Sequence, residues 1–154
     1  MTDVPSKLKE MVELFEAMPD RAARIEALIS MAERFRGVPE SIATRPYPED
    51  HRVQECESQA YVWAEKRDDG TLQFHFAVEN PQGISAMATA VLLDETLSGA
   101  PPEQVSRIPR DIVYAFFGRE LSMGKTMGLM GMVDRVKKYA RSAAATESAS
   151  KTTA

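Results

Sequence analysis

Apolar residues recur at helical spacing near the start of the chain. One series covers residues 8–18 and a second covers residues 25–35, and each places its apolar side chains on one helix face. Pro19 and Asp20 lie between the two series, where a proline ends one helix and an aspartate caps the next. The pattern therefore predicts a helical hairpin whose apolar face must pack against the rest of the protein.

The pattern changes after a proline-containing loop over residues 38–52. Residues 53–66 are rich in β-branched and aromatic side chains, Asp69-Gly70 forms a turn signal, and residues 72–78 alternate between apolar and polar. This pattern predicts an antiparallel β-hairpin. Because the helices come before and after it without βαβ alternation, we expect an α+β fold: a small antiparallel sheet of about three strands with helices packed on one face.

Further helices are predicted after the hairpin. Asn80 and Pro81 resemble a helix cap followed by a first-turn proline, and an apolar series over residues 84–97 follows them. Two short helical stretches are predicted next, over residues 103–106 and 110–117, with Gly118 as a stop signal.

Ser122 is positioned to cap a last, long helix. Arg135 and the basic residues after it are interpreted as cations near the negative C-terminal end of that helix. The segment from Ala143 onward is rich in alanine, serine and threonine, which favours a frayed or disordered tail. We therefore expect one domain over residues 1–142 and a tail over residues 143–154.

Composition narrows the classes of partner. The net charge of -4 argues against a nucleic-acid partner, because nucleic-acid-binding domains cluster Lys and Arg to neutralise phosphates. No apolar run approaches the roughly 18 residues that span a bilayer, and the first five residues lack the pattern of a signal peptide. We expect a cytoplasmic protein without a membrane partner, in a compartment that keeps thiols reduced.

Cys56 is the only cysteine of the chain. A single thiol forms no intramolecular disulfide and supplies no structural zinc site, so it is either an inert core residue or a lone nucleophile. Its neighbours Glu55, Glu57 and Ser58 are polar, and the segment joins a loop to a strand, where functional residues often lie. The residues alone leave both interpretations open.

The two histidines, His51 and His75, are the only available bases for a cysteine hydrolase. His51 is five residues from Cys56, which makes a thiol hydrolase a third hypothesis, but the spacing favours solvated surface histidines. No pair of Cys or His residues has the spacing of metal ligands, so we expect neither a metal nor a cofactor.

The last predicted helix combines methionines and glycines. The methionines form either part of the core or an adaptable partner surface: Met123, Met127, Met130 and Met132. The glycines indicate close approach of another backbone segment: Gly124, Gly128 and Gly131.

The segment from Val53 to Tyr61, VQECESQAY, resembles the V-x-G-C-x-S-x-V-W motif of the SufE family. Leu121 to Gly128 is similar to the family's L-T-P-S-R-x-x-G, and the resemblance runs from about Leu8 to Tyr139. Further matching segments lie in the same order: Asp69-Gly70, Leu72 to Phe76, Leu97-Ser98-Gly99 and Pro102-Glu103. The chain departs from the family pattern at four places: Glu55 replaces a glycine, Tyr61 a tryptophan, Lys125 an arginine, and Glu79 remains from an acidic pair.

The resemblance implies a SufE/IscU-like fold and a sulfur carrier rather than a stand-alone enzyme. Cys56 would accept persulfide sulfur from a pyridoxal-phosphate-dependent, SufS-like cysteine desulfurase, stimulate that enzyme and deliver the sulfur to a SUF-type, SufBCD-like scaffold for iron–sulfur clusters. The resemblance also implies an apolar cavity for the cysteine, formed with Tyr61 and Ala60, from which the thiol swings out. It implies these supporting residues: Glu55, Ser58, Tyr61, Glu79 and Lys125. The alternative is a non-catalytic interaction module that uses the methionine-rich helix, with Cys56 structural.

Overall fold

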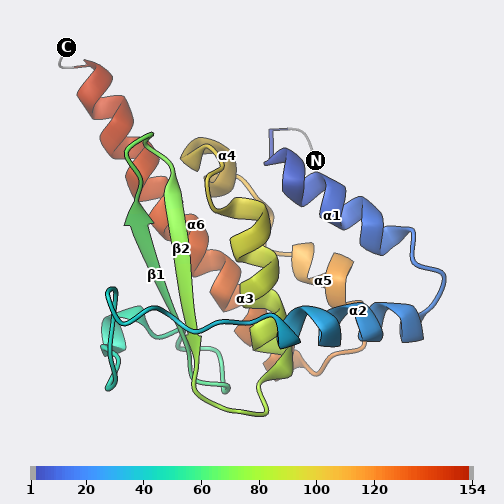
Figure 1. Cartoon of the computed structure of the whole chain (residues 1–154). Helices are drawn as coiled ribbons and strands as arrows, with labels where there is room; N and C mark the ends of the chain where they lie inside the picture. The colour runs from blue at the N-terminus through green and yellow to red at the C-terminus, as the bar shows by residue number, and fades with distance from the viewer. Residues whose placement is uncertain (1–2, 153–154) are drawn as a thin grey trace.

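A computed structural model describes the backbone of residues 3–152 and the side chains of residues 3–146. The elements form an α+β fold, as the sequence predicts (Figure 1). In chain order they are α1 (Ser6–Glu16), α2 (Arg21–Glu33), the 3-10 helix η1 (Glu49–His51), β1 (Ala60–Lys66), β2 (Leu72–Val78), α3 (Ile84–Leu97), α4 (Pro102–Ser106), α5 (Ile112–Phe117) and α6 (Met123–Thr152).

The predicted hairpin of α1 and α2 is confirmed. The Asp20 carboxylate caps α2 by accepting a hydrogen bond from the Ala23 N–H at 2.9 Å. On the buried face of α1, Phe15 meets Phe116 of α5 edge to face, with ring centroids 5.1 Å apart. The hairpin also packs against α3, so its apolar face is covered by the helices that follow the sheet.

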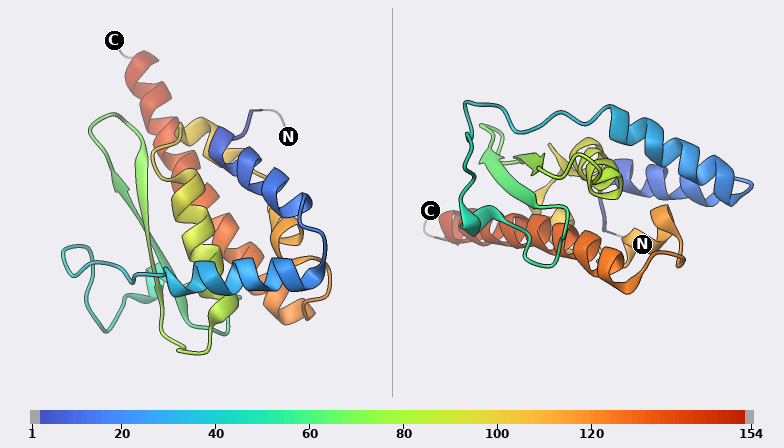
Figure 2. Two further views of the ribbon diagram at one scale, coloured as in Figure 1. Left: turned by 45° about the vertical axis from the view of Figure 1, so that its right-hand side comes forward. Right: turned by 90° about the horizontal axis from the view of Figure 1, so that it is seen from below.

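Helix α3 lies in the middle of the fold, between the α1–α2 hairpin on one side and β2 and α6 on the other (Figure 2). Most of its side chains are buried, as expected for a helix that is apolar on all sides. Its predicted start was wrong, because Asn80 caps a turn instead of the helix: its Oδ1 accepts the Gln82 N–H at 2.9 Å. The helix begins only at Ile84, after Gly83.

The sheet has two strands among the described residues, where the sequence predicted about three. Strands β1 and β2 are antiparallel, with Ala60 opposite Val78 and Lys66 opposite Leu72. The segment before β1 adds a single antiparallel bridge, between Arg52 and Tyr61. A third strand does not form because the chain leaves this pairing one residue later and turns into the loop that carries Cys56.

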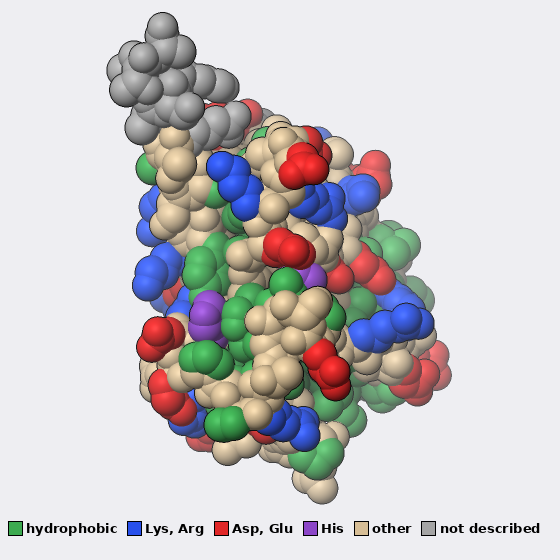
Figure 3. Space-filling model, turned by 60° about the vertical axis from the view of Figure 1, so that its left-hand side comes forward, with side chains coloured by type: hydrophobic (Ala, Val, Ile, Leu, Met, Phe, Trp, Pro, Cys, Tyr) green, Lys and Arg blue, Asp and Glu red, His purple; other side chains and the backbone are tan. Residues whose placement is uncertain are grey.

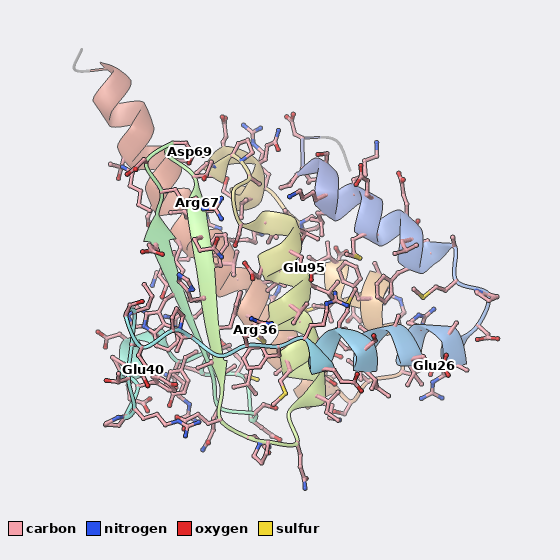
Figure 4. The ribbon with its side chains drawn as sticks, in the orientation of Figure 1. Glu26, Arg36, Glu40, Arg67, Asp69 and Glu95 are labelled. Atoms are coloured by element: carbon pink, nitrogen blue, oxygen red, sulfur yellow. The ribbon has the colours of Figure 1, made fainter. Side chains whose placement is uncertain are left out.

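The two faces of the sheet are covered differently. Helices cover only one face, as predicted, and the residues that point to it include Val62, Phe74 and Phe76. The outer face holds a second, smaller apolar cluster of Tyr61, Trp63 and Ala77. This cluster is covered by the loop that follows α2, and Figure 4 shows Glu40 on that loop.

Helix α6 runs along the fold and is longer than the sequence predicts. Ser122 caps it as expected, since its hydroxyl accepts the Lys125 N–H at 3.2 Å. The backbone of residues 143–152 is helical, which differs from the predicted frayed or disordered tail; residues 153 and 154 lie outside the described residues. Alanine has the highest helix propensity, and extending an existing helix is easier than starting one. Arg135 therefore lies inside the helix and not near its C-terminal dipole end.

Candidate functional site

Cys56 lies in a loop, residues 53–59, which we call the cysteine loop. The Val53 N–H donates a hydrogen bond to the Ala60 carbonyl at 2.9 Å, which holds the two ends of the loop together. Inside the loop, the Cys56 N–H donates to the Val53 carbonyl at 3.1 Å. Gln59 has a φ of 55°, a left-handed conformation that is unfavourable for a residue with a side chain. The loop is therefore a defined turn at the end of the sheet opposite the hairpin tip, where Figure 4 labels Arg67 and Asp69.

The Cys56 side chain is buried, with 5% of its surface exposed, although its neighbours Glu55 and Glu57 are exposed. It lines a cavity of about 210 Å³ between the cysteine loop, the segment before α3 and the start of α6. Ile84 and Lys125 line the same cavity and are exposed, so the cavity reaches the surface. A sulfur atom here is shielded on most sides but lies close to solvent.

The first turns of two helices border this cavity. Ile84 and Ser85 belong to the first turn of α3, and Gly124 and Lys125 belong to the first turn of α6. The N-terminal end of a helix carries a partial positive charge, which stabilises anions within about one turn. One basic residue, Lys125, and one acidic residue, Glu57, line the cavity beside these helix ends.

The structure brings together only part of the predicted site. Ser58 and Lys125 line the cavity with Cys56. Glu55 is adjacent in the loop but is directed toward α6, where its carboxylate packs against Gly131.

Tyr61 and Glu79 lie elsewhere. The Tyr61 ring belongs to the outer cluster and stacks with Trp63 at a centroid distance of 6.1 Å, so it does not form the cavity as the sequence analysis expected. Successive side chains of a strand point to opposite faces, which places Tyr61 away from α3 and α6. Burial, followed by the negative charges of Glu79 and Glu49, raises the pKa of Tyr61. Glu79 pairs with Arg45 at 3.4 Å, and its backbone N–H donates a hydrogen bond to the Gln59 carbonyl in the cysteine loop.

Three residues of α6 contact the cysteine loop or the segment just before it, and the sequence analysis did not include them among the site residues. A Cβ on Gly128 would meet the backbone of the loop at Glu55 and Cys56, which confirms the close backbone approach predicted for this glycine. A Cβ on Gly131 would meet the side chains of Val53 and Glu55 instead. Gly124, by contrast, has no neighbour within 4 Å of where a Cβ would lie. The Arg135 guanidinium donates hydrogen bonds to the carbonyl oxygens of Asp50 and Arg52, at 2.7 Å for Arg52.

His51 is not the base of a catalytic pair with Cys56. It does not line the cysteine cavity, and its Nδ1 lies 2.9 Å from the Val62 carbonyl oxygen and 3.1 Å from the Tyr139 hydroxyl. Because a carbonyl only accepts, Nδ1 carries the proton. The predicted solvated position was wrong: the ring is half-buried and stacks on Trp63 at 5.2 Å.

His75 is also half-buried rather than solvated, and its Nε2 lies 3.1 Å from Glu65 Oε1. Figure 3 shows histidine side chains at the surface of this side of the molecule, beside hydrophobic side chains. Neither histidine therefore supports the thiol-hydrolase hypothesis.

The methionines of α6 fall into two groups. Met130 and Met132 are buried in the core, whereas 82% of Met123 and 44% of Met127 are exposed. The exposed pair lies in the same stretch of α6 as the cavity residues Gly124 and Lys125. Met130 and Met132 therefore belong to the core, and Met123 and Met127 remain candidates for a partner surface.

The residues that the structure describes form neither a cluster of metal ligands nor a membrane-spanning helix. Across those residues, no three His, Cys, Asp or Glu side chains are grouped so that they could hold a metal ion. Similarly, none of the helices there is long and apolar enough to cross a membrane.

Comparison with known proteins gives a consistent result. Residues 9–140 match the family described as "SufE: Fe-S metabolism associated domain". The cysteine desulfuration protein SufE of Plasmodium vivax is 25% identical over 137 residues, which are 88% of this chain and 53% of that protein. SufE-like protein 1, chloroplastic/mitochondrial, of Arabidopsis thaliana is 26% identical over 139 residues, 90% of this chain and 36% of that protein. The chain thus spans about half or less of these relatives.

The fold is also shared with a solved structure. The solution structure of a hypothetical protein from Thermus thermophilus superimposes with a TM-score of 0.71 and 28% identity, covering 92% of this chain and 98% of that one.

Proposed function

Because the chain belongs to the SufE family, we propose that it is a sulfur acceptor and carrier with Cys56 as the acceptor. In this role it takes persulfide sulfur from a pyridoxal-phosphate-dependent cysteine desulfurase of the SufS type and stimulates that enzyme. It then passes the sulfur to a SUF-type scaffold on which iron–sulfur clusters are assembled. The observation that carries the proposal is the position of the only thiol, in a loop beside a cavity that reaches the surface.

The chemistry requires one sulfur-to-sulfur exchange. The Cys56 thiolate attacks the outer sulfur of the persulfide on the desulfurase cysteine, the S–S bond of that persulfide breaks, and the enzyme cysteine leaves as a thiolate. The outer sulfur keeps its proton, so the product is a persulfide on Cys56. No oxidant or reductant is consumed, and the acceptor needs only a thiolate and a path to the partner.

The cavity suits the carried sulfur. A water molecule occupies about 30 Å³ in the liquid, so a space of about 210 Å³ has room for one additional sulfur atom. The first turns of two helices line the space next to Cys56 together with Lys125, and Ser58 contributes a hydroxyl group to the same lining. The surrounding residues limit access by other thiols while the sulfur is carried.

The test is loading of Cys56 by a purified SufS-type desulfurase with free cysteine, followed by intact-protein mass spectrometry. We expect the mass to rise by one sulfur atom, reductant to remove it, and Cys56→Ala to remain unmodified. Alanine is the better replacement, since it removes the sulfur without adding a hydroxyl group. An unchanged mass beside an active desulfurase would contradict the proposal.

A second candidate function is a non-catalytic interaction module, which the exposure of Met123 and Met127 favours. Large exposed apolar side chains often mark partner surfaces. The two functions differ in the Cys56→Ala variant: a module still binds the desulfurase and changes its turnover, whereas a sulfur carrier still binds but no longer stimulates. Alanine release by the desulfurase, measured with each variant, separates them.

We also propose that the protein works in the cytoplasm, where a solitary thiol stays reduced. Fractionation of the source cells with an antibody against this chain tests that location. Recovery in an organelle fraction would contradict it.

A further inference from the structure

The buried position of Cys56 depends on contact between two stretches of backbone. A Cβ placed on Gly128 of α6 would lie 3.1 Å from Cys56 Cα, 3.2 Å from the Glu55 carbonyl oxygen and 3.4 Å from Cys56 Cβ. The first two of these neighbours are backbone atoms, which no side-chain rotation can move. The cysteine loop therefore rests on α6 at a point where only a hydrogen atom fits comfortably.

Gly131 extends this contact by one helical turn. Its added Cβ would lie 2.8 Å from Val53 Cγ1 and 2.7 Å from Glu55 Oε2. Gly124, on the other side of Gly128, has nothing within 4 Å. Of the three glycines of α6, Gly128 and Gly131 therefore lie against the loop, and Gly124 provides a natural control.

The opposite side of the loop is held by the segment between β2 and α3. The Asn80 N–H donates to the Ser58 carbonyl at 3.2 Å, and a Cβ on Gly83 would lie 3.0 Å from the Ser58 hydroxyl. The loop is thus enclosed between this segment and α6, with the Cys56 side chain inside. A side chain that grows from position 128 can be accommodated only if the loop moves away from α6.

We propose that Gly128 is a positioning residue that sets how much of the time Cys56 is buried, with Gly131 assisting it. Glycine at position 128 stabilises the buried position, and a larger side chain shifts the loop outward and exposes the thiol. The use of the exposed thiol rests on the sulfur-carrier function proposed above. The exposure itself does not, and it can be measured without any partner.

The experiment measures the rate at which Cys56 reacts with a small, neutral aromatic disulfide under native conditions. Cys56 is the only thiol of the chain, so the measured reaction rate reports the accessibility of this residue alone. We expect Gly128→Leu to react at least about tenfold faster than the wild type, equivalent to about 1.4 kcal/mol, and Gly128→Ala to be intermediate. Gly124→Ala and Gly124→Leu should react at the wild-type rate. Equal rates for the wild type and both position-128 variants would overturn the inference.

General destabilisation is distinguished by repeating the reaction in low concentrations of urea. Local opening of a loop exposes little surface, so its rate changes little with urea, whereas global unfolding accelerates steeply. The inference requires fast reaction of a position-128 variant with little urea dependence; steep dependence would overturn it. Should Gly128→Leu fail to fold, Gly128→Ala against Gly124→Ala decides the result in the same way.

Position 131 gives a further comparison, because its contact involves side chains. Val53→Ala should slow the thiol reaction of Gly131→Ala by removing Cγ1, and it should not slow that of Gly128→Ala, which meets backbone. Loading by the desulfurase is scored separately. If the position-128 variants react faster but no sulfur is loaded, this inference holds and the sulfur-carrier function is contradicted. If sulfur is loaded but the thiol rates are unchanged, the sulfur-carrier function holds and this inference is contradicted.

Discussion

Arg135 anchors the approach to the cysteine loop, and its replacement should have a measurable cost. From the interior of α6, its guanidinium donates to the carbonyls of Asp50 and Arg52, the latter at 2.7 Å. These carbonyls lie just before the loop. Arg135→Met keeps a long apolar stem but removes both donors, so the segment before Val53 loses its attachment to α6.

The size of the effect follows from the contacts. A hydrogen bond to a charged group contributes about 1.5–3 kcal/mol. Arg135 is half-buried, so water replaces part of each lost bond, and we expect a total loss of about 2 kcal/mol for Arg135→Met. For a domain of this size that corresponds to a fall in Tm of about 4–8 °C. Arg135→Lys keeps the charge but not the two-pronged geometry, and should lose about 1 kcal/mol.

The free energy of unfolding is measured by urea denaturation followed by circular dichroism. Arg141→Met is the matched control, because Arg141 is exposed on the same helix and makes no hydrogen bond or ion pair with the described residues. Hydrogen exchange adds a local readout: the Val53 N–H, bonded to the Ala60 carbonyl, should lose protection in Arg135→Met. A loss no larger than that of Arg141→Met, with unchanged protection at Val53, would refute the anchoring role.

Three further predictions concern the surroundings of the loop. The pKa of Tyr61 is raised above 10.0, so the unfolded chain loses this proton first; stability should fall as pH rises from about 10 toward the folded pKa. Urea denaturation against pH should show a smaller alkaline loss for Tyr61→Phe, and identical profiles would count against this. Gln59→Val places a β-branched residue at a φ of 55° and should lower the free energy of unfolding by at least about 1 kcal/mol, whereas Gln59→Gly should not; equal denaturation midpoints would exclude strain at this position. Met123→Ser with Met127→Ser should raise the apparent KM for desulfurase stimulation without changing the Cys56 thiol rate, and an unchanged KM would remove these methionines from the docking surface.

Local signals in the sequence were sufficient for most of the secondary structure. The Asp20 cap, the Gly118 stop and the Ser122 cap all act within a few residues, and each marks a helix boundary in the structure. Asn80 shows the limit of such signals. The same residue type caps helices and turns, and only the backbone around it decides which of the two forms.

The candidate site, like the secondary structure, could be predicted only in part from the sequence. The sequence pointed to Cys56 through its uniqueness and its polar neighbours, and to Ser58 and Lys125 through the family pattern, and all three meet at one cavity. Tyr61 and Glu79 were predicted from the same family pattern, yet Tyr61 lies in the outer cluster and Glu79 lies beside it. Successive residues of a strand point to opposite faces of the sheet, and only the packing of α3 and α6 decides which face is the inner one.

The sequence by itself determined the helical periodicity, most of the caps, the hairpin and the presence of a single thiol, because each of these can be read from residues close together in the chain. Only the tertiary structure decided that Cys56 is buried, that Gly128 lies beneath it and that Arg135 holds the segment before it. The last two contacts join residues more than seventy positions apart. Their formation depends on how α6 packs along the sheet, which no local pattern of side chains specifies.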